Sequence, residues 1–210
     1  MSAQRIIDPG ASTSAVPRRP KLLRRFVDHG AVVAAWVGVG MAVTIGVSFL
    51  LVIPIEPIYW LLAFPAGALI GYYANQRSDR RAGPMTRILM NGLYAALVTA
   101  LTLAVLMLLV KALFFYADTG YRDPGQGGQI TCTSGADCVY QRYAQSSQGP
   151  QLAAAGITDA ASFTPYYWNQ QFTTALIVIA LCLGGGLFGA LLYGASRPRG
   201  ARVTAPVRTG

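Results

Sequence analysis

The feature that most constrains this chain is a run of 23 residues without a charged side chain, Ala31 to Ile53. A helix needs about 20 mostly apolar residues to cross the hydrocarbon core of a bilayer, which is about 30 Å thick. Three more apolar runs follow, at 58–74, at 88–117 (interrupted only by Lys111) and at 172–195. Only 12% of all residues are charged, about half the share in soluble domains, so too little polar sequence remains to cover four such helices in water. The sequence predicts an all-α membrane protein with four transmembrane helices.

The apolar runs divide the chain into five parts. The first run is predicted to be a retained signal anchor, because its apolar region is longer than the roughly 7–15 residues of cleaved signals and about 30 residues precede it. We expect a largely disordered basic segment at 1–30, transmembrane helices 1–3 within 31–117 (about 31–53, 58–74 and 88–117), a loop subdomain at 118–164, transmembrane helix 4 at 165–195 and a basic tail at 196–210.

Basic residues set the predicted orientation. Of the 17 Lys and Arg, 14 lie in the N-terminal segment, between the second and third apolar runs, and in the C-terminal tail. Because basic residues near span ends stay in the cytoplasm, we expect both termini in the cytoplasm and the loop at 118–164 outside. This distribution explains the net charge of +9 without a nucleic-acid partner. Arg far outnumbers Lys, and Ala and Gly are abundant, which indicates a GC-rich coding sequence and a multi-pass protein of a bacterial plasma membrane.

Glycines spaced by multiples of four predict where the helices pack, because small side chains let backbones approach one another within a membrane. The pairs are Gly38 and Gly46 in the first run, Gly67 and Gly71 in the second, and Gly185 and Gly189 in the fourth. The third run has neither Gly nor Pro after Gly92. We therefore expect the first, second and fourth helices to form a tight core while the third faces more lipid. Pro65 predicts a structural kink in the second helix.

The long loop carries signs of local order. Residues 134–137 match the S-x-x-[DE] capping box, in which side chains satisfy free amides at a helix start, and they predict a helix that follows. A second short helix is predicted over 151–155 and ends at Gly156, a residue type favoured after a helix C-terminus. A third is predicted over 158–163. The loop is therefore expected to be partly helical.

The fourth helix is predicted to begin with Thr164 as N-cap and Pro165 in the first helical position. Aromatic residues surround this start and are also frequent in the predicted helix after residue 134. Since aromatic side chains commonly anchor protein contacts, we expect the exterior contact surface to include Tyr140, Tyr143, Phe163, Tyr166, Tyr167 and Trp168.

Two of the three cysteines, Cys132 and Cys138, lie in the same loop. An exterior compartment is oxidising, so we predict a structural disulfide between them that closes the loop. A catalytic pair of the kind found in four-span thiol oxidases would need a second cysteine pair, and the short first exterior segment, 54–57, has none. Cys182 lies within the fourth run and is predicted to be a small apolar residue there.

No arrangement of residues predicts catalysis or metal binding. The single histidine, His29, lies beside Asp28, without a Ser, Cys or second carboxylate to complete a site. The sequence contains no zinc-binding cluster and no nucleotide-binding glycine motif, so we expect no enzymatic activity, no cofactor and no metal. Glu56 and Lys111 lie toward the predicted exterior ends of their spans, and a pairing between them is a structural hypothesis.

These observations predict a location more directly than an activity. The leading hypothesis is a small integral membrane protein that acts as an accessory or interaction protein through its exterior loop. The alternative is an oligomeric transporter or channel subunit, motivated by Pro65 and the glycine pairs. The lipid bilayer is the one partner that the composition predicts directly; the glycine pairs are compatible with a homo-oligomer or with a membrane-protein partner.

Overall fold

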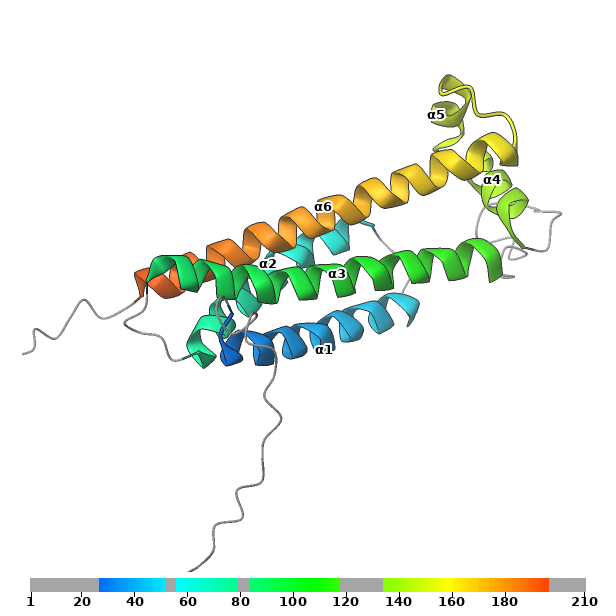
Figure 1. Cartoon of the computed structure of the whole chain (residues 1–210). Coiled ribbons are helices and arrows are strands. Elements are labelled where there is room, and N and C mark those ends of the chain that lie inside the picture. The colour runs from blue at the N-terminus through cyan, green and yellow to red at the C-terminus, as the bar shows by residue number, and fades with distance from the viewer. Residues whose placement is uncertain (1–26, 52–55, 79–83, 118–133, 197–210) are drawn as a thin grey trace, which may run out of the picture.

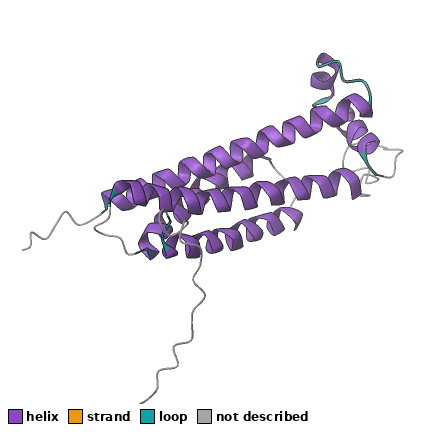
Figure 2. Ribbon diagram, in the orientation of Figure 1, coloured by secondary structure: helices purple, strands orange, loops and turns teal. Residues whose placement is uncertain are grey.

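The computed structural model describes residues 27–51, 56–78, 84–117 and 134–196, and the regular structure within them is entirely helical. This confirms the predicted all-α class. These described ranges contain four long helices and two short ones, whose arrangement Figures 1 and 2 show. Their bounds are α1 His29–Leu51, α2 Glu56–Arg77, α3 Met85–Ala117, α4 Ala136–Gln145, α5 Gly149–Ala154 and α6 Ala160–Ala195.

Three helices are long and apolar enough to cross a membrane: α1 over His29–Ser48, α3 over its whole length and α6 over its whole length. Helix α2, which contains the predicted second span at 58–74, is not among them. Its last turn is polar, with Asn75, Gln76 and Arg77, and this lowers the hydropathy of the helix. The structure therefore shows a chain able to cross a membrane several times, with three helices meeting the criterion where the sequence predicted four.

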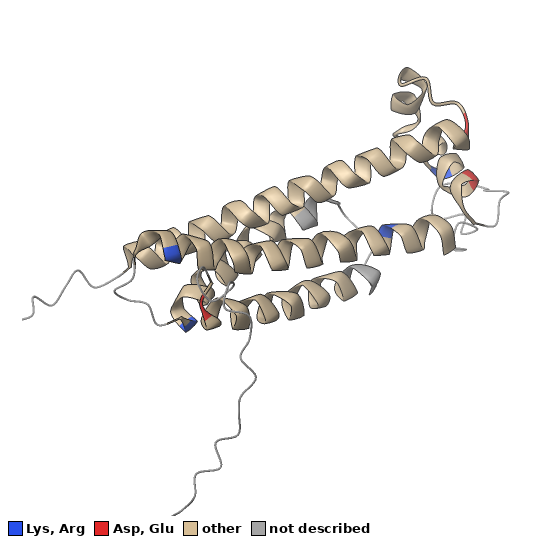
Figure 3. Ribbon diagram, in the orientation of Figure 1, with Lys and Arg blue, Asp and Glu red and all other residues tan. Residues whose placement is uncertain are grey.

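The four long helices lie side by side along a common direction (Figure 1). The start of α1 and the end of α6 are at one end of the molecule, which we call the terminal end. Helices α4 and α5 are at the opposite end, the cap end, and we call residues 134–163 the cap. Charged side chains of the described residues gather toward these two ends and leave the middle of the long helices free of charge (Figure 3).

Helix α3 packs against all three other long helices, α6, α1 and α2, and α2 likewise packs against α6, α1 and α3. Helices α1 and α6 hardly touch one another. The expectation that α3 faces lipid while α1, α2 and α6 form the core is therefore wrong. Alanines take the place that glycine was expected to fill, since Ala95, Ala96 and Ala100 of α3 are all fully buried.

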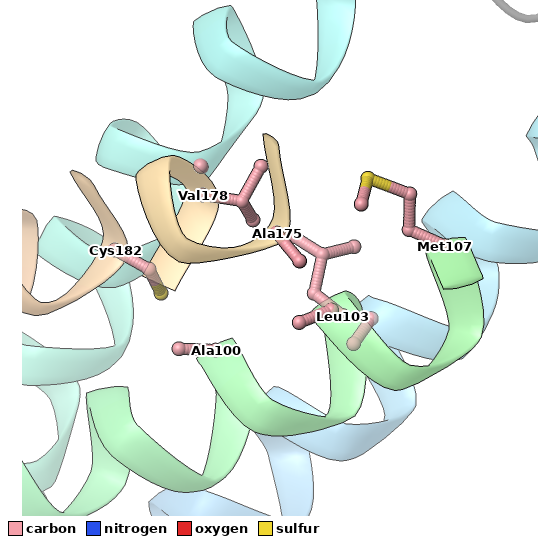
Figure 4. Packing of buried hydrophobic residues seen from close by; sticks show 9 residues of the cluster. Ala100, Leu103, Met107, Ala175, Val178 and Cys182 are labelled. Atoms are coloured by element: carbon pink, nitrogen blue, oxygen red, sulfur yellow. The ribbon is translucent and has the colours of Figure 1, made fainter. Parts of the chain in front are cut away.

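The largest buried apolar cluster lies in the middle of the bundle, where α3 and α6 face one another (Figure 4). Leu103 and Met107 of α3 pack with Ala175, Val178 and Cys182 of α6. Outward-facing side chains on all four long helices are also apolar, for example Trp36, Leu61, Leu101 and Leu176. In a membrane protein such side chains contact lipid.

The start of α6 differs from the prediction. Its N-cap is Asp159, whose carboxylate accepts a hydrogen bond from the Ser162 backbone N–H at 2.7 Å. Pro165 lies inside the helix, and Thr164 donates its hydroxyl proton to the Ala160 carbonyl instead of capping. A short helix at 158–163 and a span beginning at 165 are therefore one continuous helix of 36 residues. Asp159 provides the N-cap with a side-chain hydrogen bond, and the helix continues through Pro165 although this proline has no N–H to donate to the preceding turn.

The two short helices also depart from the expected details. The N-cap of α4 is Gly135, with a φ of 88° and no side-chain cap bond, so the predicted capping box at 134–137 does not form. Helix α5 begins at Gly149, two residues before the predicted start. Its C-terminus is a Schellman motif, because Gly156 has a φ of 72° and the Ile157 N–H donates to the Leu152 carbonyl at 3.0 Å. The predicted role of Gly156 is confirmed.

Candidate functional site: the cap and the polar layer beneath it

The predicted packing glycines of α2 and α6 lie against each other's backbone. A Cβ atom at Gly67 would overlap the Cys182 carbonyl oxygen, and one at Gly71 would lie 2.8 Å from the Gly186 Cα. In return, a Cβ atom at Gly185 would overlap the Phe64 carbonyl oxygen, and one at Gly189 would overlap that of Ala68. These two parallel helices therefore approach at backbone contact distance.

The glycines of α1 contact α3 rather than α2 or α6. Gly38 lies directly over the side chain of Thr99, and a Cβ atom at Gly46 would lie 3.4 Å from Leu106. Gly92 of α3 receives the methyl group of Ala190 from α6. Each of the six predicted glycines thus lies at a helix contact, and the two glycines of α1 contact α3.

The cap has an aromatic core of its own. Phe163 is fully buried and Tyr167 is nearly so, and their ring centroids lie 5.8 Å apart. Tyr140 and Tyr143 of α4 pack against Phe163 at 5.7 and 5.2 Å. Phe163 and Tyr167 are therefore internal packing residues rather than surface contacts.

The remaining four of the six predicted contact aromatics, Tyr140, Tyr143, Tyr166 and Trp168, are partly exposed around the aromatic core of the cap. Leu152 and Ile157 bring α5 and its Schellman turn into the same cluster. The cap is consequently an ordered helical subdomain rather than an open loop.

The aromatic core of the cap is continuous with the end of α3. Phe115 is 1% exposed and its ring centroid lies 4.9 Å from that of Tyr167 and 5.6 Å from that of Trp168. Tyr116 stacks on Trp168 at 6.2 Å. Since these rings join α3 to α6, the orientation of the cap is fixed relative to the long helices.

A layer of buried polar side chains lies directly beneath this aromatic contact. Gln171 is 0% exposed, Thr174 is 6% exposed and Lys111 is 8% exposed. Phe115 contacts Tyr167, and Ala96 lies over Gly186 on the same pair of antiparallel helices. Lys111 lies four residues before Phe115 on α3, and Gln171 lies four residues after Tyr167 on α6. Because the two helices are antiparallel, both steps lead one turn away from the Phe115–Tyr167 contact, so Lys111 and Gln171 lie at the same level. We call Lys111, Gln171 and Thr174 the polar layer.

Gln171 was not among the residues that the sequence singled out, because it directly precedes the apolar run at 172–195 and belongs to no recognised motif. Neither its amide oxygen nor its amide nitrogen has a hydrogen-bond partner in the described structure. A signal was present, since Gln171 lies four residues after Tyr167 and four before Ala175, which puts all three on one helix face. The side chain of Glu56 lies outside the described residues, so its pairing with Lys111 stays a prediction.

A second polar group lies at the terminal end. Asn91 of α3 accepts a hydrogen bond from the Asp28 backbone N–H at 3.0 Å and donates to the Asp28 carboxylate at 2.9 Å. Asn75 of α2 is fully buried and donates to the Ile88 carbonyl at 3.0 Å. These contacts tie the beginning of α1 and the end of α2 to α3. His29 is exposed beside this group.

The described residues contain no group of three or more His, Cys, Asp or Glu side chains that could hold a metal ion. Cys138 is fully buried in the aromatic core of the cap, and its predicted partner Cys132 lies outside the described residues. Cys182 is a buried free cysteine whose thiol lies 3.6 Å from the Ala96 carbonyl. Neither a protein-family model, nor a curated protein, nor a solved structure matches this chain.

Proposed function

We propose that this chain is an accessory or interaction protein of the plasma membrane, and that its cap recognises a partner protein outside the cell. Both termini are then cytoplasmic, as the 14 basic residues of the N-terminal segment, the second connection and the tail favour. The observation that carries the proposal is the aromatic core of the cap, which holds α4 and α5 in a fixed orientation on α3 and α6.

In this proposal α2 is the fourth membrane crossing. It lies beside α6, α1 and α3 and returns the chain from the cap end of α1 to the terminal end of α3 (Figure 1). Its 22 residues extend over about 33 Å at 1.5 Å per residue, which matches the thickness of the hydrocarbon core. A helix packed among three spanning helices over this length crosses the same layer, and its polar last turn then lies at the cytoplasmic surface.

The composition of the cap surface suits recognition of a protein. It carries the partly exposed tyrosines Tyr140 and Tyr143 of α4, and the exposed residues Pro150, Ala153 and Ala154 of α5 are uncharged. Protein interfaces are enriched in Tyr and depleted of charge at their centre. We also propose that the Cys132–Cys138 disulfide closes the start of α4, since Cys138 is buried in the aromatic core that the disulfide would help to fix.

Co-purification in mild detergent tests the proposal. We expect a stoichiometric partner to copurify with the wild-type chain and to be lost when Ala153 and Ala154 are both replaced by Arg. Because both positions are exposed, these substitutions leave the core of the cap intact. The matched control is Ser196→Arg, an exposed position at the terminal end, which should retain the partner. Loss of the partner in the control, or its retention in the double variant, would refute a role for the cap.

The second candidate is an oligomeric transporter or channel subunit. The observation that favours it is the polar layer, since buried ionisable groups within membrane helices often mark solute or ion pathways. Purified chain in liposomes should then conduct ions or take up solutes, and Gln171→Met should reduce that flux. A chain that forms oligomers without any flux would dismiss this candidate.

A further inference from the structure

We propose that the polar layer is a hydrated site, which holds water between α3 and α6 beneath the cap. The proposal starts from Gln171, whose whole side chain is buried and whose amide oxygen and nitrogen both lack a partner among the described residues. Buried polar groups in proteins are nearly always hydrogen-bonded, and water is the usual partner where protein groups are not within reach. Water satisfies a carboxamide fully, because it donates to the oxygen and accepts from the nitrogen.

The neighbouring side chains add the polar contacts that an internal water needs. Lys111 lies level with Gln171 on the facing helix, and Thr174 follows three residues later on the same face of α6. An ordered internal water makes about three hydrogen bonds. An ammonium, a carboxamide and a hydroxyl supply these donors and acceptors from two helices. A single apolar substitution within the layer would therefore remove part of the water's binding site.

The position of the layer indicates that the water comes from the cap end. Lys111 is six residues from the end of α3 and 26 from its start, which corresponds to about 9 Å and about 39 Å of helix. On the terminal side the layer is closed by the apolar cluster that contains Met107, Ala175 and Val178. The hydrated site thus lies near the cap end of the long helices, and the apolar cluster separates it from the terminal end.

Two adjacent threonines allow a matched test of hydration. Thr174 faces the polar layer and is 6% exposed, whereas Thr173 faces outward and its hydroxyl bonds to the Asn169 carbonyl. Each is replaced by Cys in the full chain carrying Cys182→Ala, and the protein is placed in lipid nanodiscs, where both membrane faces meet the buffer. The probe is a charged, lipid-insoluble methanethiosulfonate, and the adduct is measured by mass spectrometry against the Cys182→Ala parent.

We expect Thr174→Cys to be modified roughly tenfold faster than Thr173→Cys, because the reactive thiolate forms only in contact with water. Adding Gln171→Met to Thr174→Cys should slow that modification about fivefold, since the water loses its main partner. Equal or slower modification at position 174 than at position 173 would overturn the proposal. An unchanged rate in the Gln171→Met variant would overturn the role of Gln171. These outcomes do not depend on the orientation of the chain or on any partner of the cap.

Discussion

The backbone contact between α2 and α6 predicts opposite effects of the same substitution at two neighbouring positions, Gly185 and Gly184. A Cβ atom at Gly185 would overlap the Phe64 carbonyl oxygen and lie 2.9 Å from the Ala68 nitrogen, whereas one at Gly184 would meet no atom within 4 Å. Carbon atoms normally approach other heavy atoms to about 3.5 Å. Gly185→Ala therefore forces the helices apart by about 1 Å or more, while Gly184→Ala adds a methyl group in open space.

The loss of unfolding free energy depends on the length of the contact between α2 and α6 that must open, which we call the seam. A gap of about 1 Å removes about half of the dispersion attraction of each contact, and Gly67, Gly71 and Gly189 lie in the same seam. Overpacking substitutions typically cost about 1–3 kcal/mol, and we expect Gly185→Ala to reach the upper part of that range. Gly184→Ala should be neutral or stabilise by up to about 1 kcal/mol, because alanine favours the helix over glycine.

Thermal unfolding in detergent, followed by tryptophan fluorescence, measures both effects. For a chain of this size about 1 kcal/mol corresponds to roughly 2–4 °C in Tm, so Gly185→Ala should lower Tm by several degrees while Gly184→Ala should not. Gly40, where an added Cβ atom would likewise meet no atom within 4 Å, provides a second control on α1. Equal effects of the two substitutions, or a greater loss at Gly184, would show that α2 and α6 do not pack through this face.

Three further predictions concern the N-cap of α6, the hydrogen bonds of Asn91 and the proposed disulfide. The pKa of Asp159 lies below its ordinary value of 3.8 because Ser162 donates side-chain and backbone hydrogen bonds to it. The Asp159 N-cap therefore stabilises α6 above the unfolded pKa, and this stabilisation is lost as pH falls through the folded pKa. Asp159→Asn should remove this acid-side loss of helicity, measured by circular dichroism. Asn91→Ala should cost about 1–3 kcal/mol in unfolding free energy, because it leaves the N–H of Asp28 unsatisfied. Without reductant, the denatured chain should bind one maleimide, at Cys182, and after reduction three; three before reduction would exclude the proposed disulfide.

The helical class and the end of α5 were predictable from sequence because they depend on local signals. Apolar runs of membrane-crossing length admit one secondary structure, since backbone polar groups in lipid must be satisfied within the segment. Gly156 after a short helix favours this local motif because glycine adopts a positive φ without steric cost. The start of α6 was harder, because Asp159 and Thr164 are both good N-caps and the choice depends on whether the turn between them packs. Burial of Phe163 in the aromatic core of the cap selects the earlier start.

The order of the helices was not predictable from the glycines alone. Gly92 accepts the methyl group of Ala190, and Gly186 accepts that of Ala96, so one glycine and one alanine are enough for a close approach. The alanine-rich face of α3 therefore packs closely against α6 without a glycine on both helices. Glycine pairs in the sequence indicate only one of the two helices at each such contact. They do not indicate a helix such as α3, which contributes alanine methyl groups.

The polar layer was not predictable either, because its burial depends on contacts between distant parts of the chain. A glutamine next to aromatic residues at the edge of an apolar run is typical of a membrane interface, and sequence alone places it in water. The extension of α6 to Ala160 moves Gln171 to its twelfth residue, and the contact between Phe115 and Tyr167 closes the helices above it. The aromatic core that holds the cap on the long helices therefore also encloses the polar layer. A partner that moves the cap would change the access of water to Gln171, so binding at the cap and hydration of this layer are expected to be coupled.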